Sequence, residues 1–180
     1  MSVVCPTWAD LHLTETQTKP AKLLLNGYRG VLCAMGLGTG KTLTAVHAVD
    51  MLYRAKKITN ALVVTKKSLR LDYLKACERC MGHVPKYYHG GDRVITYDGL
   101  KNHPDKYPVG KRTCMVVDEA QTYANFTKTY HAAMAKAQQA GYVILLSATP
   151  FMNRATDLCP LINLISRKPG FTKFLAKQWA

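Results

Sequence analysis

Short apolar runs recur along the chain, separated by longer stretches that mix polar and apolar residues. The runs are rich in Val and Ile, and almost every position within them is apolar. Strands that are covered on both faces of a sheet have this pattern, whereas strands with one wet face alternate strictly. We therefore predict five buried strands, at Val31–Ala34, Ala61–Thr65, Val94–Thr96, Cys114–Val117 and Val143–Leu146.

The stretches between these runs carry apolar residues three or four positions apart, which is the spacing of a helix face. The helices predicted on this basis are Thr42–Lys56, Ser68–Met81, Lys128–Ala140 and Asp157–Ile165. Ser68 is a candidate N-cap for the second helix, and Gly141 is a natural stop for the third. Residues 82–93 and 102–112 are expected to be irregular, because the second segment contains two prolines and a glycine.

Alternation of strands and helices indicates an α/β fold with a mostly parallel central sheet and helices on both faces. The 180 residues are 48% hydrophobic and 20% charged, which is the composition of a globular domain rather than of a disordered chain. We see no internal repeat, low-complexity tract or long linker. We therefore expect a single domain over residues 1–180.

The charge balance is unusual for a globular domain. Twenty-five Lys and Arg residues stand against eleven Asp and Glu residues, for a formal net charge of +14. Such an excess favours a polyanionic partner, most often nucleic acid. A surface whose charge serves only solubility is the alternative.

Apolar runs in this chain are much shorter than the roughly 18 residues that a membrane span needs. Residues 1–13 also lack the basic start of a signal peptide. We therefore expect no membrane association and a location in the cytoplasm of a bacterial or phage-infected cell, or on nucleic acid. The six cysteines fit free thiols in a reducing compartment better than a disulfide framework.

Cys77 and Cys80 precede two histidines, His83 and His89, which raises the alternative of a zinc site. Structural zinc sites usually carry their cysteine pair on a turn, whereas these two cysteines fall one turn apart on a predicted helix. We therefore favour buried thiols over zinc ligands.

Residues 36–42 read Gly-Leu-Gly-Thr-Gly-Lys-Thr, between a predicted strand and a predicted helix. Glycines in that position let backbone N–H groups surround phosphate oxygens, and the helix N-terminus adds partial positive charge. The candidate ATP-binding residues are Gly36, Gly38, Thr39, Gly40, Lys41 and Thr42. Lys41 would reach the β- and γ-phosphates, and Thr42 would offer its hydroxyl to Mg²⁺. Met35 stands where the strict motif has glycine, and the alternative is a Gly-rich turn before a surface lysine.

Two adjacent carboxylates, Asp118 and Glu119, end the fourth predicted strand. Asp118 is placed to hold Mg²⁺, and Glu119 is placed to activate an attacking water. With Lys41 they are the candidate catalytic residues. The alternative is a pair of solvated acids at the end of a strand.

The fifth predicted strand ends in Ser147-Ala148-Thr149-Pro150. Ser147 and Thr149 would sense the γ-phosphate and relay its presence to a bound nucleic acid strand. Taken alone this segment is a common turn, and its position after the two preceding motifs gives it significance.

Taken together, these motifs resemble the first RecA-like lobe of superfamily two helicases, specifically the Snf-type translocases of chromatin remodellers and their bacterial and phage relatives. The resemblance runs from about Leu13 to the C-terminus. The matching segments, in order, are Gly36 to Thr42, Val63 to Leu69, Tyr87 to Gly90, Val94 to Leu100, Asp118 to Gln121, and Ser147 to Pro150 with Asn153. Gln121 departs from the histidine that is more usual at its position. The resemblance implies that Gln121 joins Ser147 and Thr149 in coupling the two ligands.

The resemblance also implies ligand contacts outside the phosphate loop. Gln17 is the candidate for reading the adenine edge. The segments after the second and third strands would contact the phosphates of one DNA strand, which implicates Lys66, Lys67, Ser68, Thr96 and Tyr97. Lysines and hydroxyls at strand ends suit phosphate contacts that position duplex DNA without reading its sequence.

Proteins of this family use two RecA-like lobes, and the second lobe supplies arginines that stabilise the transition state. After Pro150 we find no second acidic motif and no Arg-rich motif. We therefore expect a lone lobe that binds ATP and Mg²⁺ but hydrolyses ATP weakly, or does so only with a second-lobe protein supplied in trans.

Two other function classes stay open. A non-catalytic adaptor or regulator would keep the fold and the basic face in order to bind DNA or a partner protein. A simple P-loop kinase is disfavoured, because the motifs follow the order found in helicases and no acceptor or lid segment is visible.

Overall fold

The computed structural model describes residue 8, residues 11–150 and residues 154–170. Its centre is one sheet of five strands in the order β1-β5-β4-β2-β3, and every neighbouring pair is parallel. The strands are β1 (Gly30–Ala34), β2 (Asn60–Thr65), β3 (Val94–Thr96), β4 (Thr113–Val117) and β5 (Tyr142–Ser147). The predicted parallel α/β fold is confirmed, with all five strands at their expected places.

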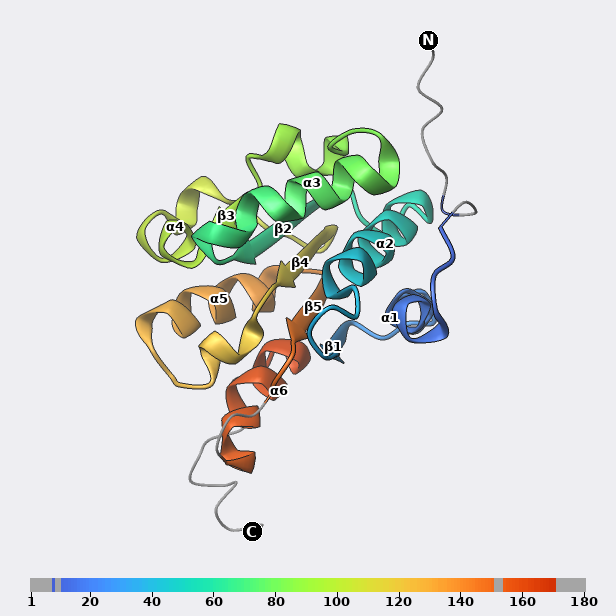
Figure 1. The fold of residues 1–180 in the computed structure, drawn as a ribbon. Coiled ribbons are helices and arrows are strands. Elements are labelled where there is room, and N and C mark those ends of the chain that lie inside the picture. The colour runs from blue at the N-terminus through green and yellow to red at the C-terminus, as the bar shows by residue number, and fades with distance from the viewer. Residues whose placement is uncertain (1–7, 9–10, 151–153, 171–180) are drawn as a thin grey trace.

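Helices cover both faces of this sheet (Figure 1). One apolar cluster packs α1 (Glu15–Leu25), α2 (Lys41–Arg54) and α3 (Arg70–Met81) against the first face. A second cluster packs α4 (Tyr97–Asn102), α5 (Lys128–Gln139) and α6 (Leu158–Ser166) against the other face. Among the described residues, no helix is long and apolar enough to cross a membrane.

Strand β4 shows why the apolar runs are continuous. Its five residues are all buried, and successive side chains go to opposite sides of the sheet. Cys114 and Val116 join the first cluster, whereas Met115 and Val117 join the second. A strand between two helical layers needs apolar residues at every position.

Two helices were not predicted. Helix α1 contains Pro20, a residue that argues against a helix interior. Its start is nevertheless specified by a capping box, because the Thr14 side chain accepts from the Gln17 N–H and the Gln17 side chain accepts from the Thr14 N–H. Helix α4 follows the hydroxyl of Thr96, which caps it by accepting from the Gly99 N–H.

Two predicted helix boundaries were wrong. Ser68 lies inside a short 3₁₀ turn, Lys67–Leu69, and Leu69 takes the N-cap position of α3 without a side-chain hydrogen bond. Helix α5 ends at Gln139 with Ala140 already extended, so Gly141 does not stop it. Glycine is required there for a different reason, since a Cβ at Gly141 would lie 1.9 Å from the Lys111 carbonyl oxygen.

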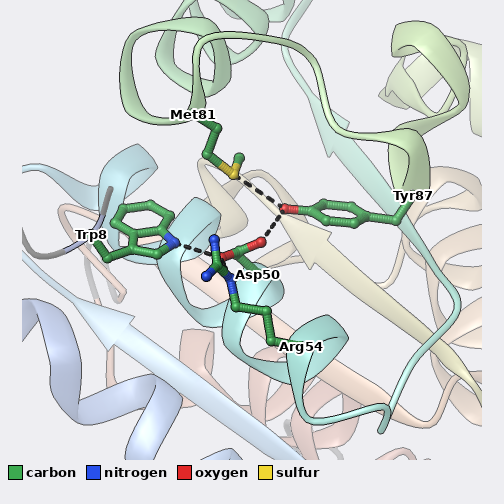
Figure 2. Close-up of polar contacts among 5 residues, drawn as sticks. All are labelled: Trp8, Asp50, Arg54, Met81 and Tyr87. Carbon is green, nitrogen blue, oxygen red and sulfur yellow. Dashed lines mark hydrogen bonds and ion pairs between the residues drawn. The ribbon is translucent and has the colours of Figure 1, made fainter. Parts of the chain in front are cut away.

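A buried carboxylate ties three parts of the chain together. Figure 2 shows Trp8, Arg54 and Tyr87 around the carboxylate of Asp50, which is 5% exposed. Trp8 Nε1 and Arg54 Nε each donate to Asp50 Oδ2 at 2.5 Å, and Tyr87 Oη donates to Asp50 Oδ1 at 3.4 Å. Because a buried charge needs such partners, Asp50 joins the chain at Trp8 to α2 and to the segment after α3.

The parallel sheet brings the carboxyl ends of all five strands to one side of the sheet, here called the carboxyl edge. Across that edge, in the order of the sheet, lie the phosphate loop after β1, Ser147 of β5, Asp118 after β4, Thr65 of β2 and Thr96 of β3. Segments far apart in sequence therefore become neighbours at the carboxyl edge, where parallel α/β sheets place their ligands.

Candidate functional site

The phosphate loop forms a tight turn between β1 and α2. Gly38 and Gly40 have φ angles of 73° and 85°, which L-residues rarely adopt. The Gly36 carbonyl oxygen accepts from Thr39 Oγ1 at 2.7 Å and from Lys41 Nζ at 3.2 Å. The lysine thus lies back over its own loop, at the N-terminus of a 14-residue helix.

Gln17, the candidate for reading the adenine edge, lies beside this loop. Its Nε2 donates to the Thr39 carbonyl oxygen at 3.0 Å, and its Oε1 accepts from the Thr14 N–H at 3.0 Å. A Cβ at Gly40 would lie 2.6 Å from Gln17 Nε2. The Gln17 amide therefore braces the loop, and its two polar atoms both have partners within the protein.

The two carboxylates after β4 have different environments. Asp118 is buried, and its carboxylate accepts from Thr65 Oγ1 and from the Glu119 N–H, each at 3.0 Å. Burial raises the pKa of Asp118, and the hydrogen bond from Thr65 opposes that rise. Glu119 is only half-buried, so it is open to a water molecule.

The backbone at Glu119 is strained. Its φ and ψ angles of 52° and 48° lie in the left-handed region, which costs a non-glycine residue on the order of 1–3 kcal/mol. The Tyr97 hydroxyl contacts the carbonyl oxygens of both Asp118 and Glu119. Tyr97 was predicted to contact nucleic acid, but its hydroxyl is turned inward to this strained segment.

A chain of side-chain hydrogen bonds joins the acid pair to β5. Gln121 Nε2 donates to Glu119 Oε2 at 2.5 Å, and Ser147 Oγ donates to Gln121 Oε1 at 2.7 Å. The structure therefore brings together Gln121 and Ser147, two of the three predicted coupling residues. The third, Thr149, is exposed and lies outside this chain of contacts, and Asn153 lies outside the described residues.

A depression of about 330 Å³, here called the loop depression, brings these segments together. Its volume is that of a small-ligand site. The described residues that line it are Gly38, Gly40, Lys41, Thr42, Leu69, Asp72, Tyr73, Asp118 and Glu119. The Thr42 hydroxyl and the Asp118 carboxylate are oxygen donors of the kind that Mg²⁺ prefers, so the residues present fit a metal-bound nucleotide.

Three residues of the loop depression, Leu69, Asp72 and Tyr73, were missed from the sequence. They belong to the start of α3, which borders the loop depression. Asp72 is the one of them with a signal, because it is an acid in the first turn of a helix in a chain poor in acids. No motif marks it, however, and only the packing of α3 brings it to the site.

Cys77 and Cys80 are both buried on α3. Burial raises the pKa of the Cys77 thiol to about 12, which keeps it protonated at neutral pH. Within the described part of the chain, no group of three or more His, Cys, Asp or Glu side chains is arranged to hold a metal ion.

The predicted nucleic-acid residues cluster near β3, beyond the acid pair. Lys66, Lys67 and Ser68 are exposed after β2. The Thr96 hydroxyl caps α4 by accepting from the Gly99 N–H. A hollow of about 770 Å³, here called the basic hollow, lies between these strand ends. Its lining is Lys66, Lys67, Arg70, Leu71, Thr96, Tyr97 and Asp98.

Comparison with known families agrees with this arrangement. The model of the SNF2-related domain matches residues 84–179, which is more than half of the chain. The chain belongs to the SNF2-related domain family. The expected resemblance to the first lobe of a superfamily two helicase is therefore confirmed.

Two relatives come from Acanthamoeba polyphaga mimivirus, and their names describe both as inferred ATP-dependent RNA helicases. One is 26% identical over 176 residues, covering 79% of this chain and 21% of the relative. The other is 27% identical over 158 residues, covering 87% of this chain and 33% of the relative. The SNF2-related domain thus spans about a fifth and a third of these two proteins.

Solved structures show the same fold at low sequence identity. The Sulfolobus solfataricus SWI2/SNF2 ATPase core in complex with dsDNA matches with a TM-score of 0.68 and 23% identity, covering 86% of this chain and 34% of that chain. The helicase domain of Pyrococcus furiosus Hef matches with a TM-score of 0.60 and 17% identity, covering 81% and 35%. The expected RecA-like fold is confirmed.

Proposed function

We propose that this SNF2-related domain binds ATP with Mg²⁺ in the loop depression and duplex DNA on the basic hollow, as one lobe of a translocase. One observation carries the proposal: Lys41, Thr42 and Asp118 come from two different strand ends and line the same depression. A Gly-rich turn with a surface lysine would not require a buried carboxylate in front of it.

The roles follow from the positions of these groups. The backbone N–H groups of the phosphate loop, from Gly36 to Thr42, would hold the phosphates, and Lys41 would turn from the Gly36 carbonyl to the β- and γ-oxygens. Thr42 and Asp118 would hold Mg²⁺, which when bound neutralises phosphate charge. Glu119 would accept a proton from the attacking water.

Gln121 and Ser147 would report the state of the γ-phosphate, because Gln121 contacts Glu119 and Ser147 in turn contacts Gln121. Gln17 would have to exchange its bond to Thr39 for one to adenine. We therefore assign Gln17 first to holding the loop and second to reading the base.

The nucleic-acid proposal rests on charge and on position. Lys66 and Lys67 are exposed at the rim of the basic hollow, and the chain as a whole carries +14. Exposed lysines beside strand ends bind the phosphate backbone and give affinity that falls with salt. The SWI2/SNF2 core with a similar fold was solved with double-stranded DNA, which makes duplex DNA the first partner to test.

Hydrolysis by this chain alone should be slow. Lys41 is the one cation among the described residues that line the loop depression. Charge developing on the transferred phosphoryl group needs further cations, and an arginine supplied from another surface is worth a factor of about 10³–10⁵ in rate. A second lobe, in the same protein or in trans, would supply it.

ATPase measurements with and without duplex DNA test this proposal against the adaptor alternative. Stimulation by DNA, lost in Glu119→Gln, is the result expected for a translocase lobe, even at a low basal rate. Salt-sensitive DNA binding with no nucleotide binding would instead identify an adaptor built on the same fold, and would overturn the proposed ATP site.

A further inference from the structure

The basic hollow has a neighbouring hollow, and Thr96 lines both of them. A second hollow of about 480 Å³ opens on the other side of this residue, beside β3. We call it the edge hollow, and the charged and polar groups that line it include Arg70, His89, Asp92, Arg93, Thr96 and Lys106. None of these residues except Thr96 belongs to the predicted nucleic-acid contacts.

The two hollows share Arg70 and Thr96, so they adjoin at these two residues, and together they are here called the groove. Strand β3 is the edge strand of the sheet, and the groove follows its open side. Arg70 reaches across that edge, because its Nε donates to the Val94 carbonyl oxygen at 2.6 Å. This bond fixes the guanidinium at the junction of the two hollows, and Arg70 as a whole is exposed.

The far wall of the edge hollow is also held in place. Arg93 is buried, and it donates to the carbonyl oxygens of Ala61 at 3.0 Å and Pro108 at 2.6 Å. These bonds attach the segment around Pro108 to β2. The attached segment presents Lys106, which is exposed at the end of the 3₁₀ turn Pro104–Lys106.

Charge along the groove is mainly positive. Lys66, Lys67, Arg70 and Lys106 are exposed cations at its rim. The groove also contains two acids, Asp92 and Asp98, of which Asp98 pairs with Lys101 at 2.6 Å. An extended groove with this balance suits a repeating anion rather than a single small one.

We propose that the edge hollow carries the phosphate backbone of duplex DNA onward from the basic hollow, with Arg70 and Lys106 as its phosphate contacts. This inference rests on the proposed DNA-binding function and adds residues that the family motifs do not mark. Because the contacts are to phosphates, they contribute affinity and position but no sequence preference.

Salt-dependent DNA binding tests the inference. Each phosphate contact contributes about 0.9 to the slope of log K against log salt concentration. Lys106→Gln should lower the magnitude of that slope by about 0.9, the contribution of one phosphate contact, and weaken binding several-fold at low salt. Lys106 is exposed, and no hydrogen bond joins its ammonium to another described residue, so the variant should fold normally.

Lys57→Gln is the matched control. It removes the same charge from an exposed lysine just before β2, on the side of the sheet opposite the carboxyl edge, and should leave the slope unchanged. Arg70→Gln provides a second test at the junction, with its fold checked by circular dichroism.

The possible outcomes separate the two proposals. If Lys66→Gln weakens binding while Lys106→Gln and Arg70→Gln both behave like Lys57→Gln, the edge hollow does not bind DNA and the proposed function stands. If the wild-type chain shows no salt-dependent binding to duplex DNA, both proposals are wrong.

Discussion

At the scale of single residues, Asp118 combines a proposed ligand role with a cost to the stability of the fold. Its carboxylate is buried beside Glu119, and burial raises its pKa above the usual value. A carboxyl whose pKa is higher in the folded state than in the unfolded state binds protons more tightly when folded. Its contribution to stability therefore falls as pH rises from the unfolded pKa through the folded pKa.

We predict that Asp118→Asn raises the unfolding temperature at neutral pH. The amide oxygen can still accept from the Glu119 N–H, the amide nitrogen can donate to Thr65 Oγ1, and the unfavourable buried charge is gone. The gain over wild type should grow as pH rises through that window. Thermal unfolding across the acidic to neutral range measures it, with the exposed Asp105→Asn as control.

The same variant should lose Mg²⁺-dependent nucleotide binding, because the carboxylate is the proposed metal ligand. A gain in stability together with a loss of binding is typical of a functional group, since such groups are often held in strained or poorly solvated positions. A variant that unfolds more easily than wild type at neutral pH would contradict this account of Asp118.

Gly40 is a second residue at which the site constrains the backbone. Its φ angle is 85°, and a Cβ there would lie 2.6 Å from Gln17 Nε2. Gly38 has a similar φ angle of 73° but open space around it. The pair therefore separates the cost of the left-handed conformation from the cost of crowding Gln17.

We predict that Gly38→Ala lowers the free energy of unfolding by about 1–2 kcal/mol, the cost of an L-residue in this region. Gly40→Ala should cost more, because Gln17 must also move. Denaturant unfolding of both variants, and of Gly40→Ala combined with Gln17→Ala, measures the difference. Equal costs in the two single variants would show that Gln17 does not press on the loop.

At the scale of elements, the ends of three neighbouring strands are joined by hydrogen bonds. Thr65, at the end of β2, donates to the Asp118 carboxylate after β4. Tyr97, directly after β3, contacts the carbonyl oxygens of Asp118 and Glu119. The proposed DNA surface and the proposed nucleotide site are therefore connected through two side chains.

We predict that Tyr97→Phe reduces the coupling between the two ligands. Without the hydroxyl, the strained backbone at Glu119 loses its contact with the end of β3, although the ring can still pack against Tyr123. Each ligand alone should bind with near wild-type affinity. Coupling of this kind is typically worth a factor of about 5–150 in affinity, and the variant should bring that factor towards one.

DNA affinity measured with and without a non-hydrolysable Mg²⁺–ATP analogue gives the coupling directly. Tyr28→Phe is the control, since Tyr28 is 59% exposed and contacts neither site. Unchanged coupling in Tyr97→Phe would show that the link does not run through this hydroxyl.

The elements also show what the sequence can and cannot predict. The buried strands were predictable because a strand between two helical layers must be apolar throughout, as β4 is. Helix α1 was missed although a capping box is present at Thr14 and Gln17, and Pro20 inside it is a residue that local patterns read against a helix. The inward turn of the Tyr97 hydroxyl and the place of Asp72 in the loop depression depend on tertiary packing, which no local pattern encodes.

At the scale of the whole molecule, the strand order separates the two proposed ligand sites. The phosphate loop follows β1 at one end of the sheet, whereas Thr96 ends β3 at the other. Between them lie Ser147, Asp118 and Thr65, all at the carboxyl edge. One SNF2-related lobe thus places the proposed nucleotide site and the proposed DNA surface along the carboxyl edge, with the hydrogen-bonded strand ends between them.

Binding of the ATP phosphates by Lys41 and its loop is measured by calorimetric titration of the protein with Mg²⁺–ATP. A charged hydrogen bond of this kind is worth about 1.5–3 kcal/mol, so Lys41→Ala should weaken binding by roughly 10- to 150-fold. Lys57→Ala, on the side of the sheet opposite the carboxyl edge, should bind like wild type. Equal affinity in wild type and Lys41→Ala, or no binding by wild type, would show that this loop is not an ATP phosphate site.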